Sequence, residues 1–166
     1  MFYLLTKVLG QRNFAGPNAS NMNFPKYPVV ASNDYRMYLF YSNGPKGIVA
    51  KGVIYSQIGM NLYNLAFGDW QQEREKLDDF SRSNNGDRDK VLATVAFTAI
   101  DFTDKYPGAQ IFAEGSTSAR TRLYQMAISN NLLEINSNFH ILGSRNGNWE
   151  PFALNANYDA FLIRRK

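Results

Sequence analysis

The pattern of apolar and polar positions predicts strands in the first half of the chain. Short apolar or alternating segments are bounded by Gly, Pro or Asn, which is typical of β-strands. Asn43-Gly44 lies between two such segments and predicts a hairpin, although Pro45 indicates a connection of more than two residues. We therefore expect an antiparallel meander, preceded by one earlier strand. The predicted strands are 2–8, 35–41, 48–55 and 62–67.

Two later segments have the spacing of amphipathic helices. Apolar residues recur every three or four positions through 87–106, where Pro107-Gly108 ends the pattern, and again through 117–133. The short apolar segment 110–113 lies between them and predicts a strand. A strand, a helix and a second strand in this order predict a crossover connection, and hence one parallel pair of strands.

The end of the chain returns to the strand pattern. Asn146-Gly147 predicts another hairpin, and Tyr158, Ala160 and Leu162 are expected on one face of a final strand. We interpret the charged segment 71–89 as a loop, and 10–28 as a loop-rich segment. The expected fold is a single α+β domain over 1–166. Its mostly antiparallel, twisted sheet would have about six to eight strands, with the two main helices packed on one face.

Composition excludes several kinds of site. Apolar residues make up 45% of the 166 residues and charged residues 19%, which is typical of a globular protein. The absence of cysteine excludes disulfides, thiolate catalysis and cysteine zinc sites. His140 is the only histidine, so a histidine-rich metal site is excluded as well. We expect no metal and no other cofactor.

The apolar start of the chain lacks the basic residues that precede the apolar run of a signal peptide. No apolar run has the length that a membrane span needs. We therefore expect a soluble, cytoplasmic protein without a membrane partner. The net charge of +4 allows an anionic partner but does not indicate which one.

The most informative stretch for function is FAEGSTSARTRLYQM, residues 112–126. It predicts a strand, a Gly-Ser-Thr-Ser turn and a helix. The first N–H groups of a helix have no internal partner and carry partial positive charge, so this turn could hold a phosphate or carboxylate. The candidate anion-binding residues are Gly115, Ser116, Thr117, Ser118, Arg120, Arg122 and Tyr124.

The same turn also has a purely structural interpretation. Ser116 or Thr117 would be a favourable N-cap, and Arg120 would pair with an acid such as Glu114. Two arginines near a helix N-terminus are unfavourable for the helix itself, which hints at function. A Walker phosphate loop is excluded because no Gly-Lys-Ser/Thr sequence is present. The sequence leaves both interpretations of the turn open.

Several stretches resemble a family of uncharacterised bacterial proteins, found mainly among Bacteroidetes. They are NNGDRDKVLATVA, FTDKYP, GSTSARTRLYQM and the tail YDAFLIRRK, and the resemblance begins at YNLAFGDW. It implies no activity and therefore assigns no catalytic residue.

Three functions follow as hypotheses. The first is a basic binding module for nucleic acid or a phosphorylated small molecule, seated at 115–120. Tyr35, Tyr38 and Tyr41 would stack on bases if they face solvent, and the favoured alternative is that they pack within the sheet. The second is an enzyme acting on a phosphate-containing substrate, such as a nuclease-like toxin of a toxin–antitoxin pair. It would use Glu114 or His140 as acid or base. The third is a protein-interaction or structural role.

Overall fold

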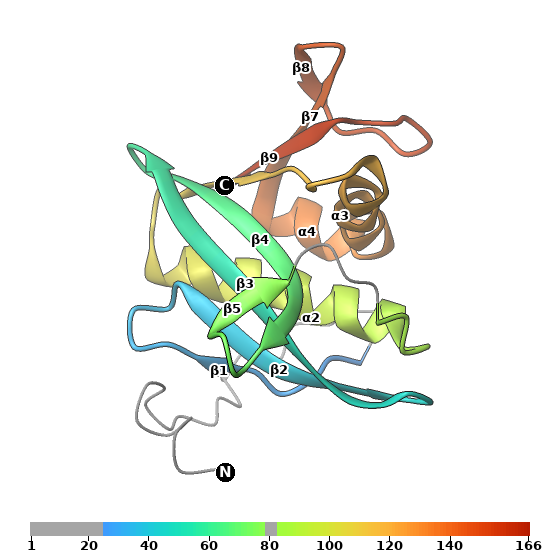
Figure 1. Cartoon of the computed structure of the whole chain (residues 1–166). Helices are drawn as coiled ribbons and strands as arrows, with labels where there is room; N and C mark the ends of the chain where they lie inside the picture. Colours follow the sequence, from blue (N-terminus) through green and yellow to red (C-terminus); the bar gives the residue numbers. More distant parts are fainter. Residues whose placement is uncertain (1–24, 79–82) are drawn as a thin grey trace.

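The computed structural model describes residues 25–78 and 83–166 (Figure 1). These residues form one mixed sheet in the order β1-β2-β3-β4-β6-β9-β7-β8, with β5 paired to β4. The strands are β1 Val30–Ala31, β2 Met37–Gly44, β3 Gly47–Gly59, β4 Leu62–Gln71, β5 Lys76–Asp78, β6 Gln110–Ala113, β7 Phe139–Arg145, β8 Asn148–Pro151 and β9 Ala160–Arg165. The helices are α2 Arg88–Lys105, α3 Ser118–Asn130 and α4 Leu132–Asn138.

The predicted meander is confirmed. Strands β2, β3 and β4 pair antiparallel in sequence order. The first hairpin closes where Gly44 faces Gly47, so its connection has only the two residues 45 and 46, and the longer connection expected from the proline was wrong. Gly47 has a φ of +92°, a conformation that favours glycine. The second hairpin turns through Met60 and Asn61 at the tip of the two longest strands.

The predicted crossover is confirmed as well. Helix α2 connects the meander to β6, which runs parallel to β4 from Leu62–Gln110 to Asn64–Phe112. Strand β9 then inserts between β6 and β7, antiparallel to both. The hairpin β7–β8 forms the end of the sheet farthest from β1, and Figure 1 shows it projecting from the molecule.

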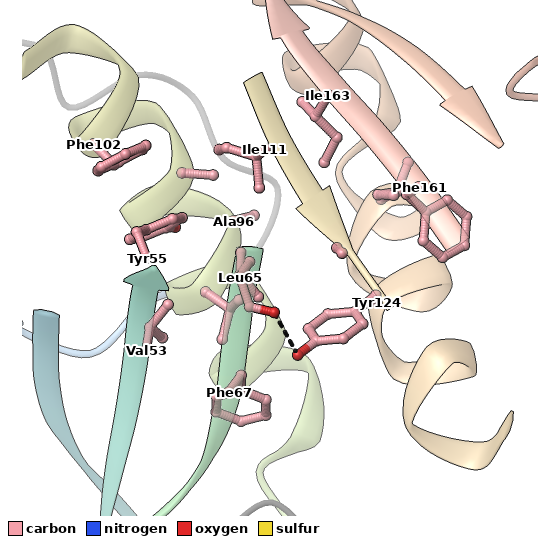
Figure 2. Packing of buried hydrophobic residues seen from close by; sticks show 14 of the residues in the cluster. Val53, Tyr55, Leu65, Phe67, Ala96, Phe102, Ile111, Tyr124, Phe161 and Ile163 are labelled. Carbon is pink, nitrogen blue, oxygen red and sulfur yellow. Dashed lines mark hydrogen bonds between the residues drawn. The ribbon is translucent and has the colours of Figure 1, made fainter. Parts of the chain in front are cut away.

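Helices α2 and α3 cover the same face of the sheet. Tyr55 of β3 and Leu65 of β4 are direct cross-strand partners, so their side chains share a face. The ring of Tyr55 stacks on Phe102 of α2 with centroids 4.1 Å apart. Figure 2 shows Leu65 next to Tyr124 of α3, whose hydroxyl donates a hydrogen bond of 3.3 Å to the Leu65 carbonyl oxygen.

Some sequence-based boundaries were wrong. The helix predicted over 117–133 ends at Asn130, and Asn131 separates it from the short helix α4. The charged segment after β4 contains strand β5 instead of only a loop. With the two-residue strand β1, the described residues contain nine strands, slightly more than expected.

The last strand also differs from its prediction. It begins at Ala160, and Phe161 and Ile163 point into the core while Leu162 is only half-buried. Leu162 therefore lies on the face opposite the helices. The strand predicted at 2–8, and most of the loop-rich segment 10–28, lie outside the described residues.

Candidate anion-binding site

The turn before α3 contains a helix cap. Thr117 is the N-cap in an extended conformation, and its hydroxyl accepts a hydrogen bond of 3.3 Å from the backbone N–H of Arg120. The backbone N–H of Gly115 donates to the hydroxyl of Thr121 at 3.0 Å. The capping interpretation of the turn is thus correct for Thr117, while Ser116 and Ser118 are exposed.

Gly115 lets the chain pass close to the first turn of α3. A Cβ atom at this position would lie 2.3 Å from the backbone nitrogen of Thr121 and 2.6 Å from the carbonyl carbon of Arg120. Backbone atoms cannot move aside as the end of a flexible side chain can, so a larger residue would displace the helix start. The turn is therefore held in one position relative to α3.

Two side chains of α3 contact the part of β4 that lies between its pairing with β6 and its pairing with β5. Strand β6 pairs with β4 only from Leu62 to Asn64. Beyond that point, Arg120 Nη1 donates to the carbonyl oxygen of Phe67 at 2.9 Å, and the hydroxyl of Tyr124 donates to that of Leu65. The two donors are one helical turn apart and match acceptors two residues apart on the strand.

Arg120 is therefore a buried residue, with only 8% of its surface exposed. It lines two cavities, and Phe67 is part of the lining of both. We call the first the turn cavity, a space of about 420 Å³ next to residues 114–116. We call the second the helix cavity, a space of about 240 Å³ between the starts of α2 and α3.

The turn cavity brings together four of the seven sequence-predicted residues. They are Gly115, Ser116, Arg120 and Tyr124. Thr117 and Ser118 are not part of its lining, and Arg122 is exposed and lines neither cavity. Glu114 contributes an exposed carboxylate to the wall.

The helix cavity contains residues that the sequence analysis did not select. Its apolar wall is formed by Phe67, Val91, Leu92, Ala119 and Leu123. Its polar wall includes Lys51, Asp69, Asp87, Arg88 and Arg120, together with residues 83–86. A sequence signal for Lys51 existed, because it shares the inward face of β3 with Val53 and Tyr55, where a charged residue is unusual.

Lys51 forms a buried ion pair in this wall. It lies directly opposite Asp69 in the register of β3 and β4, and its ammonium group donates to the Asp69 carboxylate. A second hydrogen bond of 2.5 Å runs from Lys51 Nζ to the hydroxyl of Ser83. The Lys51 side chain is only 8% exposed, so the pair compensates a charge that would be costly to bury alone.

Asp87 is the N-cap residue of α2, but its side chain makes no capping hydrogen bond. Its Oδ2 atom instead accepts hydrogen bonds from Ser42 Oγ at 2.6 Å and from the hydroxyl of Tyr27 at 2.7 Å. Burial opposes the ionised form of Asp87, but the hydrogen bonds from Ser42 and then Tyr27 outweigh it, so its pKa lies below the usual carboxyl value. Asp87 is therefore an anion at neutral pH.

Asn85 fixes the loop that carries this wall. Its buried amide group donates to Ser42 Oγ at 3.0 Å and to the carbonyl oxygen of Gly47 at 2.9 Å, and it accepts from the backbone N–H of Lys46 at 3.0 Å. These contacts attach the loop to the β2–β3 hairpin. The start of α2 thereby has a defined position beside α3.

The electrostatics of the helix cavity favour an anion. Among the described lining residues, three cations, Lys51, Arg88 and Arg120, accompany two carboxylates, Asp69 and Asp87, which gives these residues a net charge of +1 (3 − 2). Both carboxylates already accept hydrogen bonds from protein groups. The N-termini of α2 and α3, which add partial positive charge, both contribute to the lining.

Other candidate residues lie elsewhere. His140 pairs with Arg164, which in turn pairs with Gln110 at the start of β6. Glu114 comes four residues later, or about 13 Å along the strand direction. The two groups that were considered as acid and base therefore do not share a site.

The three tyrosines of the β2 region do not form a stacking surface. Tyr38 is fully buried, and its hydroxyl donates to the Asp101 carboxylate at 2.9 Å. Burial, reinforced by the negative charge of Asp101, raises its pKa far above the usual value. Tyr41 lies at odd spacing from Tyr38 and is half-exposed on the opposite face, while Tyr35 precedes the strand.

The chain belongs to a family of unknown function (DUF6934), whose sequence profile matches residues 23–166. Among curated proteins and among solved structures, none matches the chain. Within residues 25–78 and 83–166, no helix is both long and apolar enough to cross a membrane.

Proposed function

We propose that this DUF6934 protein binds a small anionic ligand whose phosphate or carboxylate group contacts Arg120. One observation carries the proposal. Arg120 is a nearly buried arginine that lines two cavities beside the N-termini of two helices. Its guanidinium has five N–H donors in a planar arrangement that suits phosphate and carboxylate groups.

The surrounding charges support the proposal. The helix cavity has a net positive lining, and its two carboxylates are engaged by Lys51, Ser42 and Tyr27. The hydrogen bond to Phe67 fixes the direction of the Arg120 side chain. An arginine that is held in place loses less conformational entropy when a ligand binds.

A small ligand fits these features better than nucleic acid does. Single-stranded nucleic acid is usually bound along an exposed basic groove with aromatic side chains on which bases stack. Tyr38 is buried and Tyr41 lies on the other face of the sheet, so they cannot provide that surface together. The two cavities, in contrast, have volumes of about 240 and 420 Å³.

The test is a titration with inorganic phosphate, a mononucleotide and a short single-stranded RNA, followed by backbone amide shifts in NMR. We expect phosphate and the mononucleotide to shift amides at 83–88 and 115–121. Arg120→Met should abolish these shifts. The matched control is Arg122→Met, which removes an exposed arginine from the same helix. Equal loss in both variants, or shifts confined to other regions, would refute the proposal.

An enzymatic role is a second candidate, favoured by Ser83. Its hydroxyl lies 2.5 Å from Lys51 Nζ and 3.5 Å from an oxygen of Asp69, within the same cavity. A hydroxyl next to a cation and a carboxylate is an arrangement found in phosphoester and acyl chemistry. Release of nitrophenol from p-nitrophenyl phosphate, lost in Ser83→Ala, would support this role, and equal rates with and without protein would exclude it for that substrate.

A further inference from the structure

The two cavities beside Arg120 differ in chemistry, and this difference indicates which part of a ligand each can hold. The turn cavity has the polar residues Asn64, Glu114 and Ser116 beside the apolar Leu65 and Ala66, so its lining is more polar than that of the helix cavity. The helix cavity has a larger apolar set in its lining, which includes Phe67, Val91, Leu92 and Leu123. Arg120 and Phe67 are common to both linings.

The helix cavity combines an apolar wall with a polar wall in which the described cations outnumber the carboxylates. Val91 and Leu92 come from α2, and Ala119 and Leu123 from α3, so the apolar wall lies where the two helices meet. The cations of the polar wall are Lys51, Arg88 and Arg120, and its carboxylates Asp69 and Asp87 already accept hydrogen bonds from protein groups. A ligand with an apolar body and an anionic head would satisfy both walls at once.

The size of the helix cavity limits that apolar body. A cavity of roughly 150 Å³ lined by apolar side chains is large enough to bind benzene. The helix cavity has about 240 Å³, which leaves room for one aromatic ring or a short branched chain in addition to the head group. A nucleobase with its ribose needs more hydrogen-bonding groups than the apolar wall offers.

We propose that the ligand is a small amphipathic acid, namely a single phosphate or carboxylate attached to one aromatic or short aliphatic group. This inference rests on the proposed function, because it takes Arg120 as the contact of the anionic head. The apolar group lies between Val91 of α2 and Leu123 of α3. These two residues determine specificity, whereas Arg120 determines whether any anion binds.

The experiment uses phenyl phosphate as the probe and isothermal titration calorimetry as the readout. Inorganic phosphate, adenosine monophosphate and a short single-stranded RNA are measured in parallel. We expect phenyl phosphate to bind at least tenfold more tightly than inorganic phosphate, because its ring leaves water for the apolar wall. We expect Arg120→Met to lower the affinity for phenyl phosphate at least tenfold.

Filling the apolar wall separates this inference from the proposed function. Leu123→Trp should weaken the binding of phenyl phosphate at least tenfold, because it fills the space for the ring. The affinity for inorganic phosphate should stay within about threefold of the wild-type value. The matched control is Leu133→Trp, the same change at a residue of α4 that is 83% exposed. Ala119→Leu fills the same space with a smaller side chain, and it replaces Leu123→Trp as the test variant if that protein does not fold.

The outcomes distinguish the two claims. The inference of an amphipathic ligand is wrong, and the proposed function stands, if inorganic phosphate binds through Arg120 and phenyl phosphate binds no more tightly. The same holds if Leu123→Trp and Ala119→Leu leave the affinity for phenyl phosphate unchanged. If adenosine monophosphate or RNA binds tenfold more tightly than phenyl phosphate, the amphipathic ligand is also wrong. If no probe binds, or binding is independent of Arg120, both claims fall.

Discussion

Arg120 of α3 and Phe67 of β4 are joined by a hydrogen bond of 2.9 Å between a guanidinium nitrogen and a backbone carbonyl oxygen. The contact spans 53 positions of the chain and lies at the point where β4 has lost its partner β6. A side chain thus takes the place of a neighbouring strand. The same arginine lines both cavities, so its structural and proposed binding roles depend on one geometry.

Arg120→Met is expected to lower the free energy of unfolding by about 1–3 kcal/mol, because the buried carbonyl oxygen of Phe67 would lose its donor. Arg120→Lys should restore only part of this, since one ammonium group on a different stem does not reproduce the guanidinium geometry. Urea unfolding measures both. Arg122→Met, on the exposed side of α3, should change stability by less than about 0.5 kcal/mol.

Gly115→Ala is expected to destabilise the protein by about 1–3 kcal/mol, because its methyl group would overlap the backbone of Thr121 and Arg120. Gly59→Ala provides the comparison, since its methyl group would meet Leu62 at an ordinary distance of 3.5 Å. Thermal unfolding of the two variants should give a clearly lower midpoint for Gly115→Ala. Similar midpoints would show that the start of α3 can shift without cost.

Asn85→Ala is expected to cost about 2–3 kcal/mol, since it removes three hydrogen bonds, those to the Ser42 hydroxyl and the Gly47 carbonyl oxygen and the one from the Lys46 N–H group. The loop before α2 should then detach from the β2–β3 hairpin. Hydrogen exchange would reveal this as faster exchange at residues 83–88. The exposed Asn157, changed to Ala, is the control and should leave these residues as protected as in the wild type.

Asp87→Asn is expected to remove a pH-dependent part of the stability. The pKa of Asp87 is lower in the folded state than in the unfolded chain, so its stabilising contribution is present above the ordinary carboxyl value of 3.8. It is lost as the pH falls through the lower, folded value. The difference in unfolding free energy between wild type and variant should therefore be largest near neutral pH and shrink below about pH 4.

Asp89→Asn removes a negative charge from the same helix start and controls for the change in net charge. Denaturant unfolding of all three proteins across this pH range provides the measurement. A difference between wild type and Asp87→Asn that does not vary with pH would contradict the assignment of the hydrogen bonds from Ser42 and Tyr27 to the charged carboxylate.

The main elements could be predicted because helix spacing and turn signals depend on residues that are close together in the sequence. The apolar spacing in α2, the Asn-Gly turns and the crossover to β6 all followed from sequence positions close together. The end of α3 at Asn130 did not, because Asn131 interrupts a pattern that continues into α4. Strand β5 was missed because its pairing with β4, not its composition, defines it.

The candidate site was predicted only where it lies within one segment. Gly115, Ser116, Arg120 and Tyr124 were identified because they are close together in the sequence. Lys51, Asp69 and Asp87 join the site through the register of β3 with β4 and through the packing of α2 against α3. These residues come together only in the tertiary structure. Among them, only Lys51 could have been noticed in the sequence, because it is a charged residue at an inward position of a strand.

The central claim is that Arg120 contacts the anionic group of a ligand, and a crystal structure of the phenyl phosphate complex tests it most directly. We predict that the phosphate oxygens lie within hydrogen-bond distance of the Arg120 guanidinium and that the ring lies between Val91 and Leu123. A phosphate bound instead at an exposed cation such as Arg164, with the helix cavity unchanged, would contradict the claim.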